Sequence, residues 1–524
     1  MADLIFHNGT VHGMTDDRQV SAAIAIRGGK VLATGSLAEL ERFRRQDTRL
    51  VNLDGATVLP GFHDAHVHLA GHGVNLERLD LTGARSVTEA LELIRAAGPG
   101  DWLLGAGFSV AQWGADSLTA AALDAVWPDR PVAMRSQDHH SAWLNSRALQ
   151  LTGIGPDTPD PAGGRIQRDG RGRPTGLLFE AAATMALSRV PQPDPQALRA
   201  ALAAAAKSLA RLGITTVHHM SAEPTAWWRA TADSASRADY PLRVWACLPQ
   251  EELEAAAALG IATGQGGDNF RIGGAKFFSD GALGSATAWM LEPYEGSQDV
   301  GVAMLDSKVF HERMALAAEA GLAPVIHAIG DAAVHDTLDA LEASRDVWQP
   351  QGLRPRIEHA QHITRQDITR MAALGVIASM QPIHLTFDAL HLQRLLGSRA
   401  PQSFAFRQFR EQGVALAFGS DTPVAPPGVI EGLRAAVERR ALDGSQFEPQ
   451  EALTIGESLH AYTRGAAWAI SREASSGQLA AGFDADLVVL SGDPYGSLDD
   501  LAVIQTVKAG QVTYDAGVLE GARA

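Results

Sequence analysis

The stretch Val58-Leu-Pro-Gly-Phe-His-Asp-Ala-His-Val-His68 contains the most informative residues of this chain, His66 and His68. Val58 and Leu59 form an apolar lead-in, and Pro60-Gly61 marks a break beside it. Residues i and i+2 of a strand point to the same face, so extended backbone aims the imidazoles of His66 and His68 into one space. Two neutral imidazoles that converge at a strand end make half of a first-row metal site. The alternative is a pair of surface histidines.

The composition is that of an ordinary globular protein. The chain has 524 residues, 46% of them hydrophobic and 20% charged, which is enough for two or more domains and a large core. A net charge of -16 argues against nucleic acid or an anionic membrane surface as partner. The single cysteine, Cys247, excludes an intrachain disulfide framework and cysteine-rich zinc sites. Nitrogen and oxygen ligands must therefore hold any bound metal.

The sequence also bears on location and partners. Residues 1–10 lack a basic region followed by a long apolar stretch, so we expect no signal peptide. No uncharged run approaches 18 apolar residues, so we expect no membrane span and a cytoplasmic location. The expected partner is a small-molecule substrate, and a homo-oligomer, a dimer or larger, is left open.

Both ends of the chain have short strands separated by turns. These segments, 1–57 and 477–524, contain apolar runs such as Ala23–Ile26 and Asp486–Leu490 beside Gly-rich turns. Short strands need partners to be stable, so we predict one small β domain formed from both termini. Two separate β appendages are the alternative.

Between these ends, residues 58–476 alternate apolar strands with Ala- and Leu-rich helical stretches, which is typical of parallel βαβ units. Eight such strands predict an α/β fold with a closed (β/α)8 TIM-like barrel and functional residues at the carboxyl ends of its strands. The candidate strands are Thr57–His66, Ile214–His219, Leu242–Leu248, Ile272–Phe278, Ala323–Ala328, Arg356–Ala360, Val376–Met380 and Ala415–Gly419. Residues 70–205 are far too long for one connection and must hold a large insertion after the first strand, a candidate lid or substrate wall. Ala197–Leu212 reads as a helix.

Further polar residues fall at the predicted carboxyl ends of later strands. Lys276 precedes His327 by 51 residues, His327 precedes His359 by 32, and His359 precedes Asp421 by 62, which suit one, one and two βα units. Each has another interpretation: His327 as a core histidine, Glu358-His359 as a surface pair, Asp421 as a turn or cap residue, and Lys276 as a snorkelling side chain. Together they favour one metal site of nitrogen and oxygen ligands.

The ordered set His-x-His, Lys, His, His, Asp resembles the amidohydrolase superfamily, nearly end to end. The terminal segments, with Asn8–Thr10, Ile26–Val31 and Gly477–Leu490, resemble the paired halves of its β-sandwich domain, so the resemblance implies a β-sandwich formed by 1–57 and 477–524. Longer motifs resemble its YtcJ-like subgroup, which includes N-substituted formamide deformylase-type enzymes; these are Asp138–Ser146, Pro174–Glu180, Lys276–Gly284, His327–Asp331 and Met380–His384. One departure is Val217-His-His219, where such relatives often carry Val-His-Asp.

The resemblance implies a metal-binding hydrolase site. His66, His68 and Asp421 would bind one divalent metal, and His327 and His359 a second, with zinc expected from the ligand types. If only one metal binds, its ligands would come from the same residues. Lys276, as a carbamate formed with CO₂, would bridge two cations. Asp421 would act as general base and then general acid for a metal-activated hydroxide.

The expected function is hydrolysis of a C–N bond in an amide, most concretely an N-acyl or N-formyl amine. Hydrolysis of a cyclic amide, ester, lactone or carbamate, deamination, or C–C cleavage are alternatives on the same scaffold. A non-catalytic relative is less expected because every ligand is present. The candidate substrate-binding residues are Trp113, His139, His140, Trp143, Asp280, Gln381 and His384.

Overall fold

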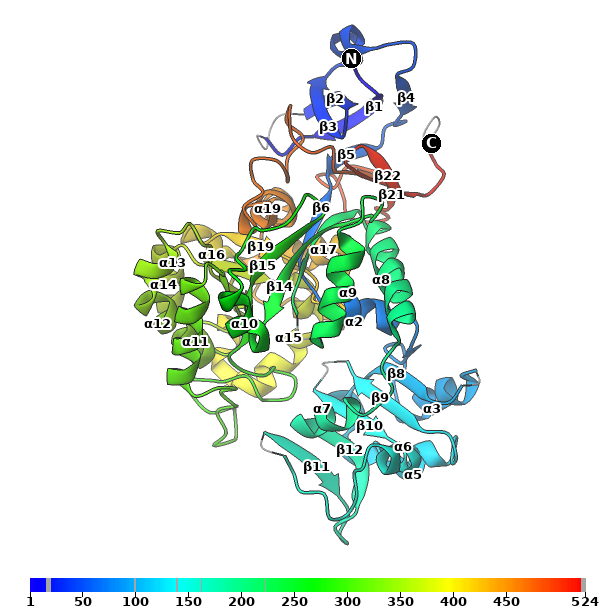
Figure 1. The fold of residues 1–524 in the computed structure, drawn as a ribbon, viewed down its shortest axis with the longest axis vertical. Coiled ribbons are helices and arrows are strands. Elements are labelled where there is room, and N and C mark those ends of the chain that lie inside the picture. The colour runs from blue at the N-terminus through cyan, green and yellow to red at the C-terminus, as the bar shows by residue number, and fades with distance from the viewer. Residues whose placement is uncertain (16–19, 99, 138–139, 162, 222, 520–524) are drawn as a thin grey trace. The chain divides into compact units, whose positions relative to one another are not determined.

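The computed structural model describes all residues of the chain except 16–19, 99, 138–139, 162, 222 and 520–524 (Figure 1). The chain forms two compact units. The first comprises Met1–Ala70 and Leu202–Ala524, and the second comprises Gly71–Ala201. The first unit contains two sheets, and the second contains one sheet of its own.

The central sheet of the first unit is a barrel of eight parallel strands. Consecutive strands along the chain are neighbours in the sheet, as βαβ units require. The strands are β6 (Phe62–Val67), β13 (Ile214–His219), β14 (Arg243–Pro249), β15 (Phe270–Phe278), β16 (Pro324–Ala328), β17 (Arg356–His359), β18 (Ile377–Met380) and β19 (Leu416–Phe418). All eight overlap the predicted strands, and the predicted α/β barrel is confirmed.

Helices alternate with these strands and cover the outside of the barrel (Figure 1). Ala197–Leu212 was expected to be helical, and the helix observed there is α8 (Pro195–Ala210). The others are α9 (Thr225–Ala235), α10 (Leu253–Ala258), α11 (Ser307–Glu319), α12 (Asp331–Ala343), α13 (Arg345–Trp348), α14 (Arg365–Leu374), α15 (Pro382–Leu396), α16 (Phe406–Glu411), α17 (Val429–Glu438), α18 (Ile455–His460) and α19 (Ala466–Ala469).

Backbone hydrogen bonds join the first strand to the segment that follows the last. Val67 forms a parallel bridge with Thr422. The Asp421 N–H donates to the carbonyl of His66 at 2.7 Å, and the His68 N–H donates to the carbonyl of Thr422 at 2.8 Å. These bonds link the two outermost strands of the sheet at their carboxyl ends.

Asp64 reinforces this junction from inside the barrel. Its carboxylate accepts the Ser420 N–H at 2.8 Å and the Ser420 hydroxyl at 2.6 Å. Gly419 permits the close approach, because a Cβ there would lie 2.4 Å from the backbone nitrogen of His66. The junction thus depends on a glycine and a buried carboxylate, both beside the histidines singled out in the sequence.

The second sheet of the first unit contains strands from both ends of the chain. Its order is β22 (Gln511–Asp515), β21 (Val503–Lys508), β20 (Leu487–Leu490), β5 (Thr57–Pro60), β1 (Leu4–His12), β2 (Val20–Arg27) and β3 (Lys30–Gly35), and β4 (Arg49–Asn52) also pairs with β1. Antiparallel pairing of β5 with β20 joins the N-terminal strands to the C-terminal ones. Alternate residues of β1 enter different apolar clusters, Leu4 and Phe6 in one and Ile5 in the other.

The expectation of one continuous strand over Thr57–His66 is wrong. The segment forms β5, which belongs to the terminal sheet, and then β6, which belongs to the barrel. The break is at Gly61, where a Cβ would lie 2.4 Å from the side chain of Thr215 on β13. The chain therefore changes sheets at a position that only glycine fits.

The second unit has a mixed sheet with its own core. The strand order is β11 (Gly164–Arg168), β12 (Pro174–Glu180), β10 (Ser141–Leu144), β9 (Val132–Ser136), β8 (Leu103–Phe108) and β7 (Leu79–Asp80). Helix α2 (Leu69–Leu76) leads into it, and its other helices are α3 (Val87–Ala96), α4 (Val110–Trp113), α5 (Ala120–Asp124), α6 (Ser146–Leu151) and α7 (Ala181–Leu187). The insertion after the first barrel strand is thus a folded unit rather than a long loop.

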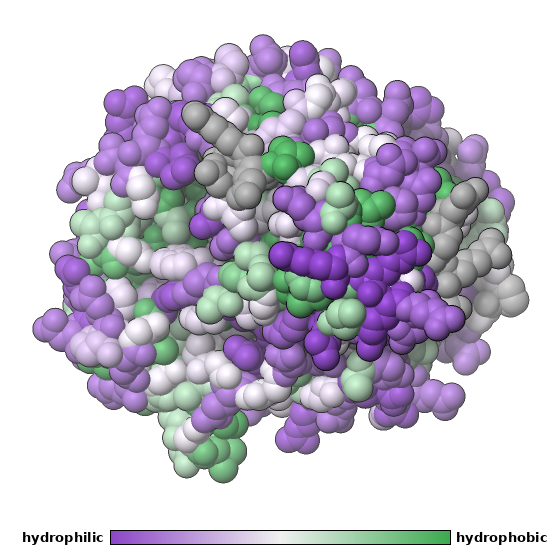
Figure 2. Space-filling model, turned by 90° about the horizontal axis from the view of Figure 1, so that it is seen from above, coloured by the Kyte–Doolittle hydropathy of each residue, from purple (hydrophilic) through white to green (hydrophobic). Residues whose placement is uncertain are grey.

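Hydrophilic residues predominate on the face shown in Figure 2, with hydrophobic residues in small groups. Across the described part of the chain, no helix combines the length and apolar character needed to cross a membrane.

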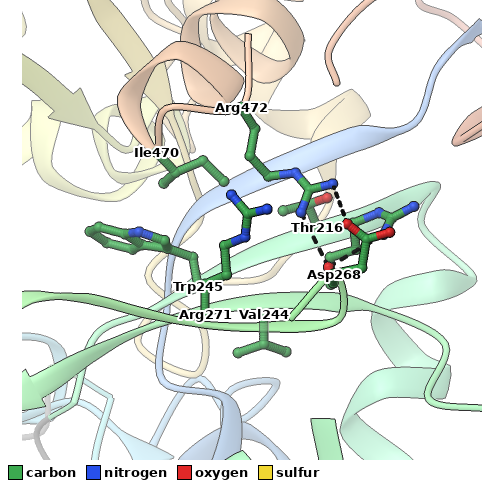
Figure 3. A pocket seen from close by; sticks show the side chains of 8 residues that line it. Thr216, Val244, Trp245, Asp268, Arg271, Ile470 and Arg472 are labelled. Carbon is green, nitrogen blue, oxygen red and sulfur yellow. Dashed lines mark hydrogen bonds and ion pairs between the residues drawn. The ribbon is translucent and has the colours of Figure 1, made fainter. Parts of the chain in front are cut away.

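A buried ion-pair network lies at the amino end of the barrel strands. Arg243, the first residue of β14, has its Nε 2.7 Å from a carboxylate oxygen of Asp486, just before β20 of the terminal sheet. Nearby, Arg472 is 2.8 Å from Asp484. Both arginines also hydrogen bond to Asp268 and line a small cavity with it (Figure 3). These pairs connect the barrel to the terminal sheet, which indicates a structural role for this end.

We expect Asp486→Asn to lower the stability of the first unit by up to about 3–5 kcal/mol, because it removes the closest carboxylate partner of the buried Arg243 and leaves only Asp268 at 3.5 Å and Asp484 at 3.6 Å. Urea unfolding followed by tryptophan fluorescence measures this loss. The control is Asp239→Asn, whose pair with Arg237 is exposed and contributes little to stability. Equal losses in the two variants would contradict a stabilising role for the buried pair.

Candidate metal centre

The imidazoles of His66 and His68 converge on one carboxylate. His66 Nε2 lies 3.3 Å from Asp421 Oδ1, and His68 Nε2 lies 3.2 Å from the same oxygen. The possible ligand atoms of the three residues all lie within 4.8 Å of one another. The backbone bonds that join β6 to the segment after β19 place the carboxylate beside the two histidines.

A second ligand group shares Asp421. It consists of His359, His384 and Asp421, whose ligand atoms also lie within 4.8 Å of one another. His384 Nε2 is 3.7 Å from Asp421 Oδ2, and its ring stacks on that of His359 with centroids 6.0 Å apart. We expected His384, in the first turn of α15, to contact substrate, but the structure places it among possible metal ligands.

The two other predicted ligands lie beside this cluster with different partners. The ring of His327 is 4.5 Å from that of His359, and its Nε2 lies 2.9 Å from the carbonyl oxygen of Gly281. Lys276 is buried in β15, where its Nζ donates to the carbonyl of Phe277 at 3.4 Å and lies 3.9 Å from the ring centroid of Phe278.

The backbone is strained where strands meet the site. His359, Ala360 and Asp421 have φ values of 73°, 42° and 65°, in the left-handed region that residues other than glycine rarely adopt. Such residues cluster at functional sites, where the surrounding structure holds them in place. Here the strain falls on two predicted metal ligands.

Burial and neighbouring charges shift the pKa values of one carboxyl group and three nitrogen groups of the site. Burial alone would raise the pKa of Asp421, but the charge of His66 and hydrogen bonds with His66 and His68 hold it well below its usual value. Burial and the neighbouring His327 hold the pKa of His359 well below its usual value. Burial lowers the pKa of Lys276 to about 8. For His66, burial is outweighed by Asp421 and Glu358, which raise its pKa.

The residues fit a divalent cation. Two buried ring nitrogens of the cluster, His359 Nδ1 and His384 Nε2, have no hydrogen-bond partner among the described residues. Buried polar atoms normally have a hydrogen-bond partner. Ring nitrogens that lack one, within a cluster of possible metal ligands, are therefore free to coordinate a metal ion. Imidazole nitrogen and carboxylate oxygen are the donors that zinc-type cations take.

Two predicted substrate-binding residues near this site, Asp280 and Gln381, form hydrogen bonds with backbone groups of the protein. The buried carboxylate of Asp280 accepts the backbone N–H groups of Trp289, Ile329 and Gly330 at 3.0, 3.0 and 2.8 Å. It therefore fixes the loop that follows β15. The side-chain amide of Gln381 donates to the carbonyl of Ser379 at 3.2 Å.

The remaining substrate candidates belong to the second unit. Trp143 is fully buried in its core, where Nε1–H donates to the carbonyl of Thr119 at 2.9 Å, and Trp113 packs against the same apolar cluster. His140 Nδ1 lies 2.8 Å from a carboxylate oxygen of Glu180. His139 lies outside the described residues.

The sequence reasoning missed one buried charged pair. Arg356 and Glu358 are fully buried in β17, and Glu358 contacts His66. The surface interpretation of Glu358-His359 is therefore wrong, because both side chains are buried. The available signal was two charged residues two positions apart in a strand of the barrel core, since charged groups are almost never fully buried unless paired.

A parallel eight-stranded barrel that gathers histidines and an aspartate at the carboxyl ends of its strands has the architecture of a metal-dependent hydrolase. The sequence profile of the Amidohydrolase family matches residues 49–514, and the chain belongs to this family.

Relatives match the chain over nearly its whole length. It is 33% identical to the putative amidohydrolase YtcJ of Bacillus subtilis (strain 168), over 98% of this chain and 99% of the relative. It is 29% identical to the N-substituted formamide deformylase of Arthrobacter pascens, over 98% and 99% respectively. The crystal structure of an uncharacterized metal-dependent hydrolase from Pyrococcus horikoshii OT3 superposes with a TM-score of 0.79 at 26% identity, covering 97% of this chain and 99% of that one.

We expect His66→Ala to weaken zinc binding by at least about 100-fold. Loss of a residue that only orients a metal ligand typically lowers metal affinity 10–100-fold, and His66 is itself a predicted ligand. Zinc titration of the metal-free protein against a competing chelator measures this change. His335→Ala is the matched control, since His335 on α12 pairs with Asp367 on α14 and not with the cluster. Unchanged zinc affinity in His66→Ala would exclude His66 as a ligand.

Proposed function

We propose that the protein hydrolyses the C–N bond of an amide, most concretely of an N-acyl or N-formyl amine. The main support is that His66 Nε2 and His68 Nε2 lie 3.3 and 3.2 Å from Asp421 Oδ1. Similarity to a putative amidohydrolase and to an N-substituted formamide deformylase supports the choice of bond.

We assign the ligands in two sets. His66, His68 and Asp421 would hold one divalent cation, and His327 and His359 a second, with zinc as the metal that suits these donors. Lys276 would bridge the cations as a carbamate. Burial supports this role, since a pKa of about 8 leaves more of the amine neutral and able to react with CO₂.

When bound, a divalent cation polarises a carbonyl and lowers the pKa of water from 15.7 toward ~7. Asp421 accepts the proton of the attacking water while the new C–O bond forms. It then donates that proton to the amine nitrogen as the C–N bond breaks, so the products are a carboxylate or formate and an amine. The low pKa of Asp421 keeps its carboxylate in the ionised form that a general base requires.

The proposed setting is the cytoplasm, with a small molecule as substrate. The one cysteine, Cys247, is buried and forms no disulfide, which suits a reducing compartment. The net charge of -16 disfavours polyanionic partners.

The choice of bond is tested with a panel of substrates that share one leaving group: N-formyl amines, N-acetyl amines, cyclic amides and esters. We expect turnover of N-formyl or N-acyl amines, loss of activity with a chelator, and recovery with zinc. Asp421→Asn should lower kcat by at least about 100-fold, because it removes the proton carrier. Turnover of esters with all amides untouched would overturn the proposal.

Carboxylation of Lys276 is tested by ¹³C NMR of protein equilibrated with ¹³C-bicarbonate. We expect one carbamate signal in the wild type that Lys276→Arg removes. Lys508→Arg is a matched control, because Lys508 is also buried with a pKa of about 8 and should leave the signal in place. Absence of the signal from the zinc-loaded wild type would exclude the bridging role.

A further inference from the structure

A buried arginine and glutamate lie directly beneath the metal centre. The side chains of Arg356 and Glu358 are both 0% exposed, and the Nε of Arg356 donates to Glu358 Oε1. Residues i and i+2 of a strand share a face, so both point into the barrel from β17. Ile357 lies between them and faces the other side of the strand. His359 ends the strand with a φ of 73°.

Glu358 makes its second contact with a predicted metal ligand. Its Oε2 lies 2.6 Å from His66 Nδ1, while the other nitrogen of the same ring, Nε2, faces Asp421. A carboxylate acceptor at Nδ1 places the ring proton there. The lone pair of Nε2 is then directed at the position shared with His68 and Asp421.

Arg356 connects this contact to three other strands. One terminal nitrogen, Nη2, donates to the carbonyl of Ala65 on β6 at 2.6 Å and also to Ser379 on β18. The other, Nη1, lies 2.9 Å from Nδ1 of His218 on β13. Arg356 therefore holds both Glu358 and the backbone immediately before His66.

We propose that Glu358 and Arg356 are positioning residues for the metal centre: Glu358 fixes His66 in the tautomer that presents Nε2, and Arg356 fixes Glu358 and the strand that carries His66. This inference rests on the proposed function in one respect, that His66 binds the metal. Neither residue contacts the position between His66, His68 and Asp421. Outer partners of this kind set ligand orientation and typically change metal affinity 10–100-fold.

A purely structural role makes a different prediction. The Arg243–Asp486 pair at the opposite end of the barrel is also buried and also joins separate segments, but it contacts no predicted ligand. If Glu358 only stabilised the barrel, Glu358→Gln and Asp486→Asn would behave alike. If Glu358 positions His66, only Glu358→Gln alters the metal centre.

The experiment is zinc titration of the metal-free wild type, Glu358→Gln and Asp486→Asn against a competing chelator, with circular dichroism as the check of folding. We expect zinc affinity about 10–100-fold weaker in Glu358→Gln and unchanged in Asp486→Asn. Wild-type affinity in Glu358→Gln, or an equal loss in both variants, would overturn the inference. A wild type that binds no zinc would instead overturn the proposed function.

A second measurement needs no variant at Glu358. In ¹H–¹⁵N spectra of the zinc-loaded wild type labelled at histidine, we expect His66 to carry its proton on Nδ1, with the resonance assigned by its absence from His66→Asn. A His66 ring protonated on Nε2 would overturn the inference even if Glu358→Gln fails to fold.

Discussion

The hydrogen bonds between residues 66–68 and 420–422 are the constraint on which the site depends. The Asp421 N–H bonds to the carbonyl of His66, and the His68 N–H bonds to that of Thr422. The same bonds that connect the outermost strands bring the Asp421 carboxylate to both imidazoles. Asp64 and Ser420 reinforce the contact from inside the barrel. The contacts that join the first and last strands of the barrel therefore also assemble this half of the candidate site.

The barrel interior concentrates groups that are costly to bury alone. Arg356 and Glu358 neutralise one another beneath the site, while the left-handed conformations of His359 and Asp421 each cost on the order of 1–3 kcal/mol. The opposite end of the barrel contains ion pairs that connect it to the terminal sheet. One end of the barrel thus gathers the predicted metal ligands and the other gathers ion pairs with the terminal sheet, as is usual for this architecture.

Much of the fold could be predicted from the sequence. Buried parallel strands appear as short apolar runs, whereas helices show apolar residues at a spacing of about 3.6 residues. The eight barrel strands and the pairing of both termini follow from such local patterns. The break at Gly61 could not be predicted, since it depends on how close Thr215 comes in space. The relation of Glu358 to His66 depends on contacts between strands 292 residues apart, which no local pattern records. Trp113 and Trp143 show the same limit, because an aromatic residue of a pocket wall and one of a core look alike in sequence.

Anomalous diffraction at the zinc edge, from crystals grown with zinc, shows directly whether His66, His68 and Asp421 hold the metal. We expect a peak ~2.0–2.2 Å from His66 Nε2, His68 Nε2 and a carboxylate oxygen of Asp421. Stoichiometric zinc with no peak at this position would contradict this assignment.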